Sequence, residues 1–130
     1  MIDTIETWHK VLETKDLNLL DSLLADDAVM ISPVVHTFQR GKGITRKYLS
    51  AASHVLGNEH FKYLAEYRGE RGVVFEFETE LDGTHINGVD IISWNDEGQI
   101  TEFKVMLRPL QAVNKVHAMM GEMLSKLPNG

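Results

Sequence analysis

The chain has 130 residues, of which 43% are hydrophobic and 25% charged, as is typical of one globular domain with its own core. It has no cysteine, which excludes disulfides, thiolate metal ligands and thiol nucleophiles. Thirteen basic against nineteen acidic residues give a net charge of -6, which argues against nucleic-acid binding. The longest uncharged stretch, 28–39, is too short to cross a membrane, and the acidic N-terminus is no targeting signal. We therefore expect a cytoplasmic protein that does not act at a membrane.

Apolar residues recur at helical spacing over 3–15, over 16–27 and again over 44–55, which predicts three helices in the first half of the chain. An aspartate stands at the capping position of each of the first two. Between the second and third helices, 28–33 and 35–39 are rich in β-branched residues and predict two short strands, the first ending at a proline.

In the second half of the chain, residues of different character alternate with a period of two, which predicts long strands with two distinct faces. Four are expected, over 61–67, 73–80, 84–94 and 100–108. Asp82-Gly83 is a strong hairpin signal, and the strand that follows it is apolar on both faces, which favours a central, doubly covered position. A final helix is predicted from Pro109 to Leu127, with three methionines. It could close the fold, pack on the domain or lie against a partner.

Helices, then a meander of antiparallel strands, then a last helix predict one α+β domain over 1–130 with a curved sheet. The segments DLNLLDSLLADDAVMISPVV, GKGITRKYL and GVDIISWNDEGQITEFKVMLRP resemble the NTF2-like superfamily, particularly its SnoaL-like and ketosteroid-isomerase-like branch. The resemblance covers nearly the whole chain. It implies a cone of antiparallel sheet packed against the N-terminal helices, a small apolar ligand inside, and homodimers formed through the outer sheet face. The predicted C-terminal helix is an addition to this cone.

Asp90 is the strongest candidate for chemistry. By alternation it shares a face with Gly88, Ile92 and Trp94. A carboxylate among such neighbours needs donors or a cation, or its pKa rises until it is neutral. A neutral acid that faces a cavity can donate a hydrogen bond to a ligand oxygen, and its spacing resembles that of the oxyanion-hole aspartic acid of ketosteroid isomerase, a case for which that behaviour is established. The alternative is a structural aspartate.

Two positions depart from the ketosteroid isomerase pattern. Ser32-Pro33 stands where the family resemblance implies a proton-shuttling aspartate before a proline, and a serine alone is not a useful base. Trp8 stands where that enzyme carries a hydrogen-bonding tyrosine, and an indole donates a hydrogen bond but is no acid. Steroid isomerisation by the family mechanism is therefore not expected.

His36 could replace the missing base because its intrinsic pKa suits proton transfer, provided that the face it shares with Phe38 is the inner one. The alternative is a surface or structural histidine. Tyr63 and Tyr67 are predicted to share one face of their strand, where their hydroxyls could meet a ligand or the rings could belong to the core. The remaining histidines are too scattered to predict a metal site.

We therefore expect a domain that binds a small apolar molecule without a cofactor or metal. Asp90 and His36 are the candidate catalytic residues, and the predicted lining is Trp8, Met30, Ser32, Tyr63, Phe77 and Trp94. Two hypotheses stay open. One is an enzyme doing proton transfer, cyclisation or hydrolysis on a carbonyl or hydroxyl compound. The other is a non-catalytic dimeric binding or interaction module with its pocket filled by side chains.

Overall fold

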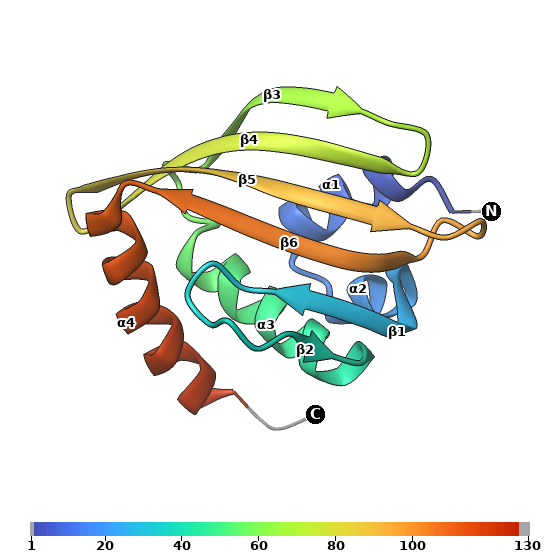
Figure 1. Cartoon of the computed structure of the whole chain (residues 1–130), viewed down its shortest axis with the longest axis horizontal. Helices are drawn as coiled ribbons and strands as arrows, with labels where there is room; N and C mark the ends of the chain where they lie inside the picture. The colour runs from blue at the N-terminus through green and yellow to red at the C-terminus, as the bar shows by residue number, and fades with distance from the viewer. Residues whose placement is uncertain (1, 128–130) are drawn as a thin grey trace.

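The computed structural model describes residues 2–127. In chain order the elements are α1 (Thr4–Thr14), α2 (Leu17–Leu23), β1 (Leu24–Ile31), β2 (Gln39–Arg40), α3 (Lys42–Val55), β3 (Lys62–Arg68), β4 (Gly72–Leu81), β5 (Thr84–Trp94), β6 (Ile100–Arg108) and α4 (Leu110–Lys126). One six-stranded sheet has the order β2-β1-β6-β5-β4-β3, with β1 parallel to β6 and the other neighbours antiparallel (Figure 1).

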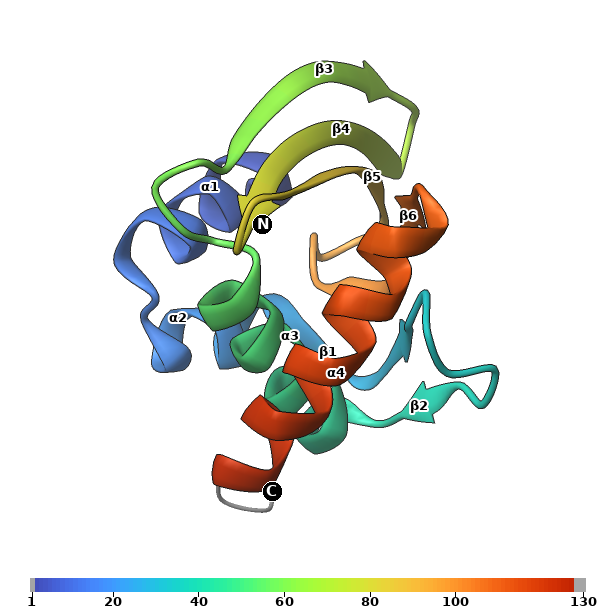
Figure 2. The same cartoon turned by 90° about the vertical axis from the view of Figure 1, so that its left-hand side faces the viewer.

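The sheet curves around the helices, which all lie on its concave side (Figures 1 and 2). The sheet does not close, because β2 and β3 each have an unpaired edge. The core lies between the concave face and the helices, where the largest fully buried side chains are Phe75, Phe77 and Phe103. The predicted α+β fold, with a curved sheet packed against helices, is confirmed.

The N-terminal helices begin where the sequence predicts. The Asp3 carboxylate accepts a hydrogen bond from the Glu6 backbone N–H, and Asp16 accepts from the N–H groups of Asn18 and Leu19. These bonds satisfy amides that have no partner within the helix. The predicted extension of the second helix to residue 27 is wrong, because the chain enters β1 at Leu24. Leu24 is fully buried and pairs with Ile100 of β6, so long-range pairing overrides the helical pattern.

The predicted strand over 35–39 is also wrong. After β1 the chain forms a loop, in which the Val34 N–H donates to the Ser32 hydroxyl, and only Gln39–Arg40 pair with β1 as β2. The other edge of β1 is occupied by β6. A run of β-branched residues has high strand propensity, but without a partner strand it stays irregular.

A bulge in β3 changes which side chains face the core. Tyr63 pairs with the inward-facing Phe77, but the register shifts before Ala65, and Tyr67 then pairs with Val74. One extra residue moves every later side chain to the opposite face. The prediction that Tyr63 and Tyr67 share a face is therefore wrong: Tyr67 lies on the outer face with 64% of its surface exposed.

The hairpin between β4 and β5 turns at Asp82 and Gly83, which have φ of 46° and 81° as a two-residue turn of this kind requires. β5 is central in the sheet, as predicted, but only its concave face is covered. Its outward side chains, including Val89 and Ile91, are half-buried, and no helix lies over them (Figure 2).

The C-terminal helix α4 packs on its own chain. Ala112, Val116 and Met120 are buried, and the helix contacts α3, β5 and β6 as it crosses the open end of the cone (Figure 2). Lys115 forms an ion pair with Asp82 of the β4–β5 turn, at 3.0 Å. Within residues 2–127 no helix has both the length and the apolar character needed to cross a bilayer.

Candidate functional site

Asp90 lies in the middle of β5, opposite Phe75 of β4 and Val105 of β6. Both of these neighbours are buried, and Asp90 itself is only 7% exposed. Strand alternation turns its carboxyl group toward the helices, as the sequence predicts. The three-strand register therefore fixes an ionisable group within an apolar layer.

A chain of hydrogen bonds joins α1, β3 and β5 at this point. The Trp8 indole Nε1–H donates to the Tyr63 hydroxyl over 2.9 Å, and the Tyr63 hydroxyl donates to Asp90 Oδ2 over 2.9 Å. The indole can only donate, so the Tyr63 hydroxyl accepts from Trp8 and uses its own proton to donate to Asp90 Oδ2. The Tyr63 ring stacks on Phe75, with ring centroids 4.5 Å apart, which fixes its direction. Trp8 thus orients Tyr63, and Tyr63 holds one oxygen of Asp90.

Burial raises the pKa of the Asp90 carboxyl from 3.8 to about 7, although the hydrogen bond from Tyr63 lowers it. Burial, followed by the nearby Asp90 charge, raises the pKa of Tyr63 well above its usual value. Tyr63 therefore keeps its proton, while Asp90 titrates close to neutral pH. An acid placed in this way can be either neutral or charged under ordinary conditions.

A small chamber lies against Asp90, with a volume of about 40 Å³. Its walls include Trp8 and Leu12 from α1, Leu49, Ala52 and Ser53 from α3, and Phe77, Phe103 and Val105 from the sheet. Asp90 Oδ1 has no hydrogen-bond partner among the described residues. Every fully buried side-chain oxygen or nitrogen in that range has a hydrogen-bond partner. Because Oδ1 has none, it is not fully buried, and it is open to the chamber that Asp90 lines.

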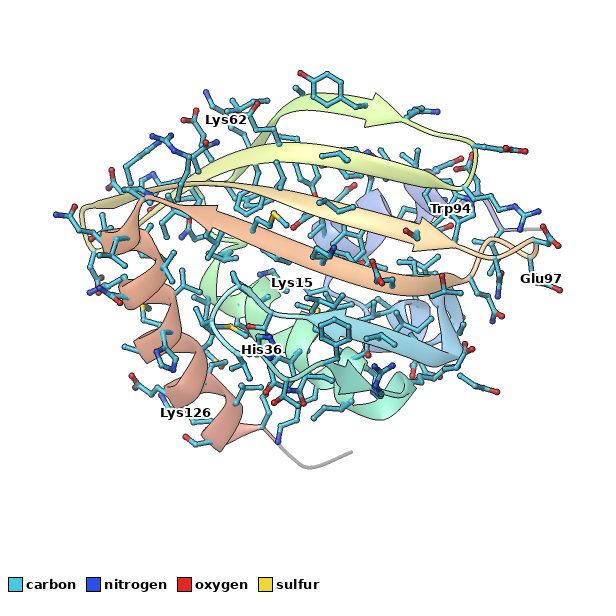
Figure 3. All side chains as sticks on the ribbon, in the orientation of Figure 1. Lys15, His36, Lys62, Trp94, Glu97 and Lys126 are labelled. Atoms are coloured by element: carbon cyan, nitrogen blue, oxygen red, sulfur yellow. The ribbon has the colours of Figure 1, made fainter. Side chains whose placement is uncertain are left out.

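Two of the six predicted lining residues, Trp8 and Phe77, form walls of the chamber. Tyr63 does not line it, but its hydroxyl donates a hydrogen bond to Asp90, which does. Met30 is buried in the core at β1, away from the chamber walls. Ser32 lies in the loop after β1, where its hydroxyl accepts from Val34 N–H. Trp94 lies near the turn that carries Glu97, at an end of the sheet (Figure 3), and lines a different surface pocket.

The structure does not bring His36 to Asp90. His36 is exposed on the loop that follows β1 (Figure 3), and it lines neither the chamber nor the other described cavities. Phe38, expected to share its face, is exposed as well. In residues 2–127 no three His, Asp or Glu side chains lie close enough together to hold a metal ion.

Several chamber residues were not predicted from the sequence. Leu49, Ala52 and Ser53 come from one face of α3, and Gly57 and Phe61 come from the connection that follows it. The sequence predicted the helix, but a helical period alone does not distinguish a residue that packs in the core from one that borders a cavity.

A curved, mostly antiparallel sheet that forms a half-open cone around helices, with an internal chamber, is the arrangement expected of an NTF2-like domain. The sequence profile of the SnoaL-like domain matches residues 5–103, and the chain belongs to this family. No curated protein has a sequence that matches the chain.

Solved structures support the same assignment. A steroid delta-isomerase from Pseudomonas aeruginosa is 31% identical, with a TM-score of 0.89 over 95% of this chain and 90% of that chain. A protein with a cystatin-like fold from Silicibacter pomeroyi is 26% identical, with a TM-score of 0.84 over 94% of this chain and 85% of that chain. SalBIII, an epoxide hydrolase/cyclase-like enzyme of pyran ring formation in salinomycin, is 20% identical, with a TM-score of 0.61 over 80% and 86%; it shares the fold.

Proposed function

We propose that this protein binds a small uncharged carbonyl or hydroxyl compound, with Asp90 donating a hydrogen bond to the ligand oxygen. The observation that carries the proposal is that the two oxygens of the Asp90 carboxyl group have different surroundings. Oδ2 is held by Tyr63, whereas Oδ1 faces the chamber without a partner among the described residues. A proton on Oδ1 would therefore point at the ligand, and the apolar walls would strengthen the bond by excluding water.

We further propose that the site supports acid catalysis of proton transfer, cyclisation or hydrolysis. In the first step the Oδ1–H bond breaks and a new O–H bond forms on the ligand, leaving a carboxylate that Tyr63 stabilises. The same carboxylate can take a proton back in a later step, so no second base is required. A pKa of about 7 suits both directions near neutral pH. The relatives named as an isomerase and a cyclase-like enzyme support this class of chemistry.

Ligand binding is expected to weaken as the pH rises through about 7, because only the neutral form of Asp90 donates. Above that pH the affinity for 2-butanone, a small uncharged ketone, should fall by about tenfold per pH unit. Binding can be followed by Trp8 fluorescence in a Trp94→Phe background. Asp90→Asn should bind with no pH dependence in this range, because its amide donates at any pH, and Asp90→Leu should not bind. A pH-independent wild type would contradict the role of Asp90.

The alternative function, a dimeric interaction module, is favoured by the outer sheet face. Cross-strand partners there form an apolar patch in which Tyr67 lies beside Val74, and Val89 lies beside Met106. Tyr67 and Met106 are 64% and 52% exposed. Exposed apolar surface of this kind is typical of protein interfaces. We propose that two copies of the chain pack through this patch.

Light scattering at about micromolar concentration, within the range in which stable dimers persist, should then report about twice the chain mass of 14.7 kDa. Met106→Glu places a charge in the patch and should give a monomer, since an unpaired buried charge strongly opposes association. Leu110→Glu is the matched control: Leu110 is 73% exposed at the start of α4, so the dimer should persist. A monomeric wild type would exclude this interface.

A further inference from the structure

A second and larger cavity adjoins the chamber. It has a volume of about 240 Å³ and lies between α1, α2 and α3. Trp8, Leu12, Leu49 and Ser53 line both spaces, so the same side chains form the wall between them. We call this second cavity the helix groove.

The chamber alone is too small for a ligand of ordinary size. A volume of about 40 Å³ corresponds to about three water-sized sites, which is room for a carbonyl group and little more. The rest of any larger ligand has to lie outside the chamber. The helix groove has six times that volume and begins at the same wall, so it is the adjoining space for the remainder of the molecule.

The groove is suited to an uncharged apolar body. Its floor is formed by buried Val11, Leu20 and Leu49, and its rim includes Leu17, a half-exposed apolar residue. Aliphatic and aromatic walls of this kind provide affinity through the removal of apolar surface from water.

The charged groups at the rim already have local partners. The Lys15 ammonium donates to the carbonyls of Ser53 and Gly57, at 2.8 and 3.1 Å. The Asp16 carboxylate caps α2, and His54 Nδ1 lies 2.8 Å from the Ser50 carbonyl. Since these groups are engaged with the backbone, the groove offers no dedicated counter-ion to a charged ligand body.

We infer that the helix groove holds the elongated, uncharged apolar body of the same ligand whose oxygen meets Asp90. This inference rests on the proposed function and narrows it to carbonyl compounds with an aliphatic chain longer than the chamber. Leu12 is half-buried and belongs to both linings, so it lies at the boundary between the two spaces.

A series of 2-alkanones from 2-butanone to 2-decanone tests this inference. With the oxygen fixed at Asp90, each added methylene should enter the groove and raise the affinity by about fourfold, until the groove is full. Trp8 borders both spaces, so its fluorescence in the Trp94→Phe variant reports binding of short and long members alike.

Leu17→Asp is the groove variant. Leu17 begins α2, where an aspartate is compatible with the helix N-terminus, and its side chain is 51% exposed, so the fold should persist. The variant should bind 2-butanone as the wild type does and lose at least tenfold in affinity for 2-decanone. Leu110→Asp, at an exposed position outside the groove, should retain the full length dependence.

The outcomes separate the two proposals. If 2-butanone binds with the Asp90-dependent pH profile but affinity is independent of chain length, the groove inference is overturned and the proposed function stands. The same holds if Leu17→Asp binds 2-decanone as tightly as the wild type. If no 2-alkanone binds, or if Asp90→Asn leaves the pH profile unchanged, the proposed function fails, and the inference fails with it. The length series on the wild type decides the matter even if a variant does not fold.

Discussion

The wild-type protein is expected to lose stability as the pH rises from about 4 to about 8, and replacing Asp90 with asparagine is expected to abolish this loss. The pKa of Asp90 is about 7 in the folded protein, against 3.8 for an unperturbed group. Between these values the folded state binds a proton that the unfolded state has released. The free energy of unfolding therefore decreases as the pH rises through this window, by about 4 kcal/mol in total, and is level above it.

Urea denaturation of both proteins across this pH range measures the effect. Other titrating groups are common to the two chains, so the difference between their free energies of unfolding isolates Asp90. The free energy of unfolding of Asp90→Asn, relative to that of the wild type, should increase as the pH rises. A constant difference would show that Asp90 is ionised throughout, with its charge satisfied by the protein, and would make it a structural residue.

Removing the Tyr63 hydroxyl is the second change with a large expected effect. Tyr63→Phe leaves the Trp8 indole N–H and Asp90 Oδ2 without their partner. The cost of leaving such groups unpaired is about 2 to 3 kcal/mol in total, measured by urea denaturation at about pH 5. The pKa of Asp90 should also rise above about 7, because the hydrogen bond from Tyr63 lowers it.

Tyr67→Phe is the matched control, since it makes the same change four residues later on β3, where the ring is exposed. Its effect should stay within about 0.5 kcal/mol. The pH midpoint of ligand binding distinguishes the roles: loss of packing alone lowers stability without moving the midpoint. A midpoint unchanged in Tyr63→Phe would argue against Tyr63 as the group that positions and tunes Asp90.

The features that the sequence predicted correctly depend on local patterns. Asp3 and Asp16 cap their helices through bonds to amides two or three residues away. The alternation of β4 and β5 places Phe77 and Asp90 on the concave side whatever their partner strands are. Local chemistry of this kind is legible in a single sequence because the interacting residues are close together in the chain.

The features that could not be predicted depend on distant residues. The bulge that turns Tyr67 outward is a property of the β3–β4 register, and the alternation of β3 alone suggested the opposite. Leu24 enters a strand because of Ile100. The hydrogen bonds among Trp8, Tyr63 and Asp90 join three elements whose approach no local pattern encodes. Trp8 and Asp90 were identified, but the position of Tyr63 between them required the assembled fold.

The parallel pairing of β1 with β6 has a consequence for synthesis on the ribosome. Leu24 pairs with Ile100 and Ile31 with Lys104, so β1 emerges long before its main partner has been translated. Until then β1 has only the two residues of β2 beside it, and β5 has an unpaired edge. Long-range pairing of this kind delays folding. The sheet should therefore be complete only once translation has passed β6, and nascent chains that stall earlier should present two further open strand edges, those of β1 and β5, to chaperones.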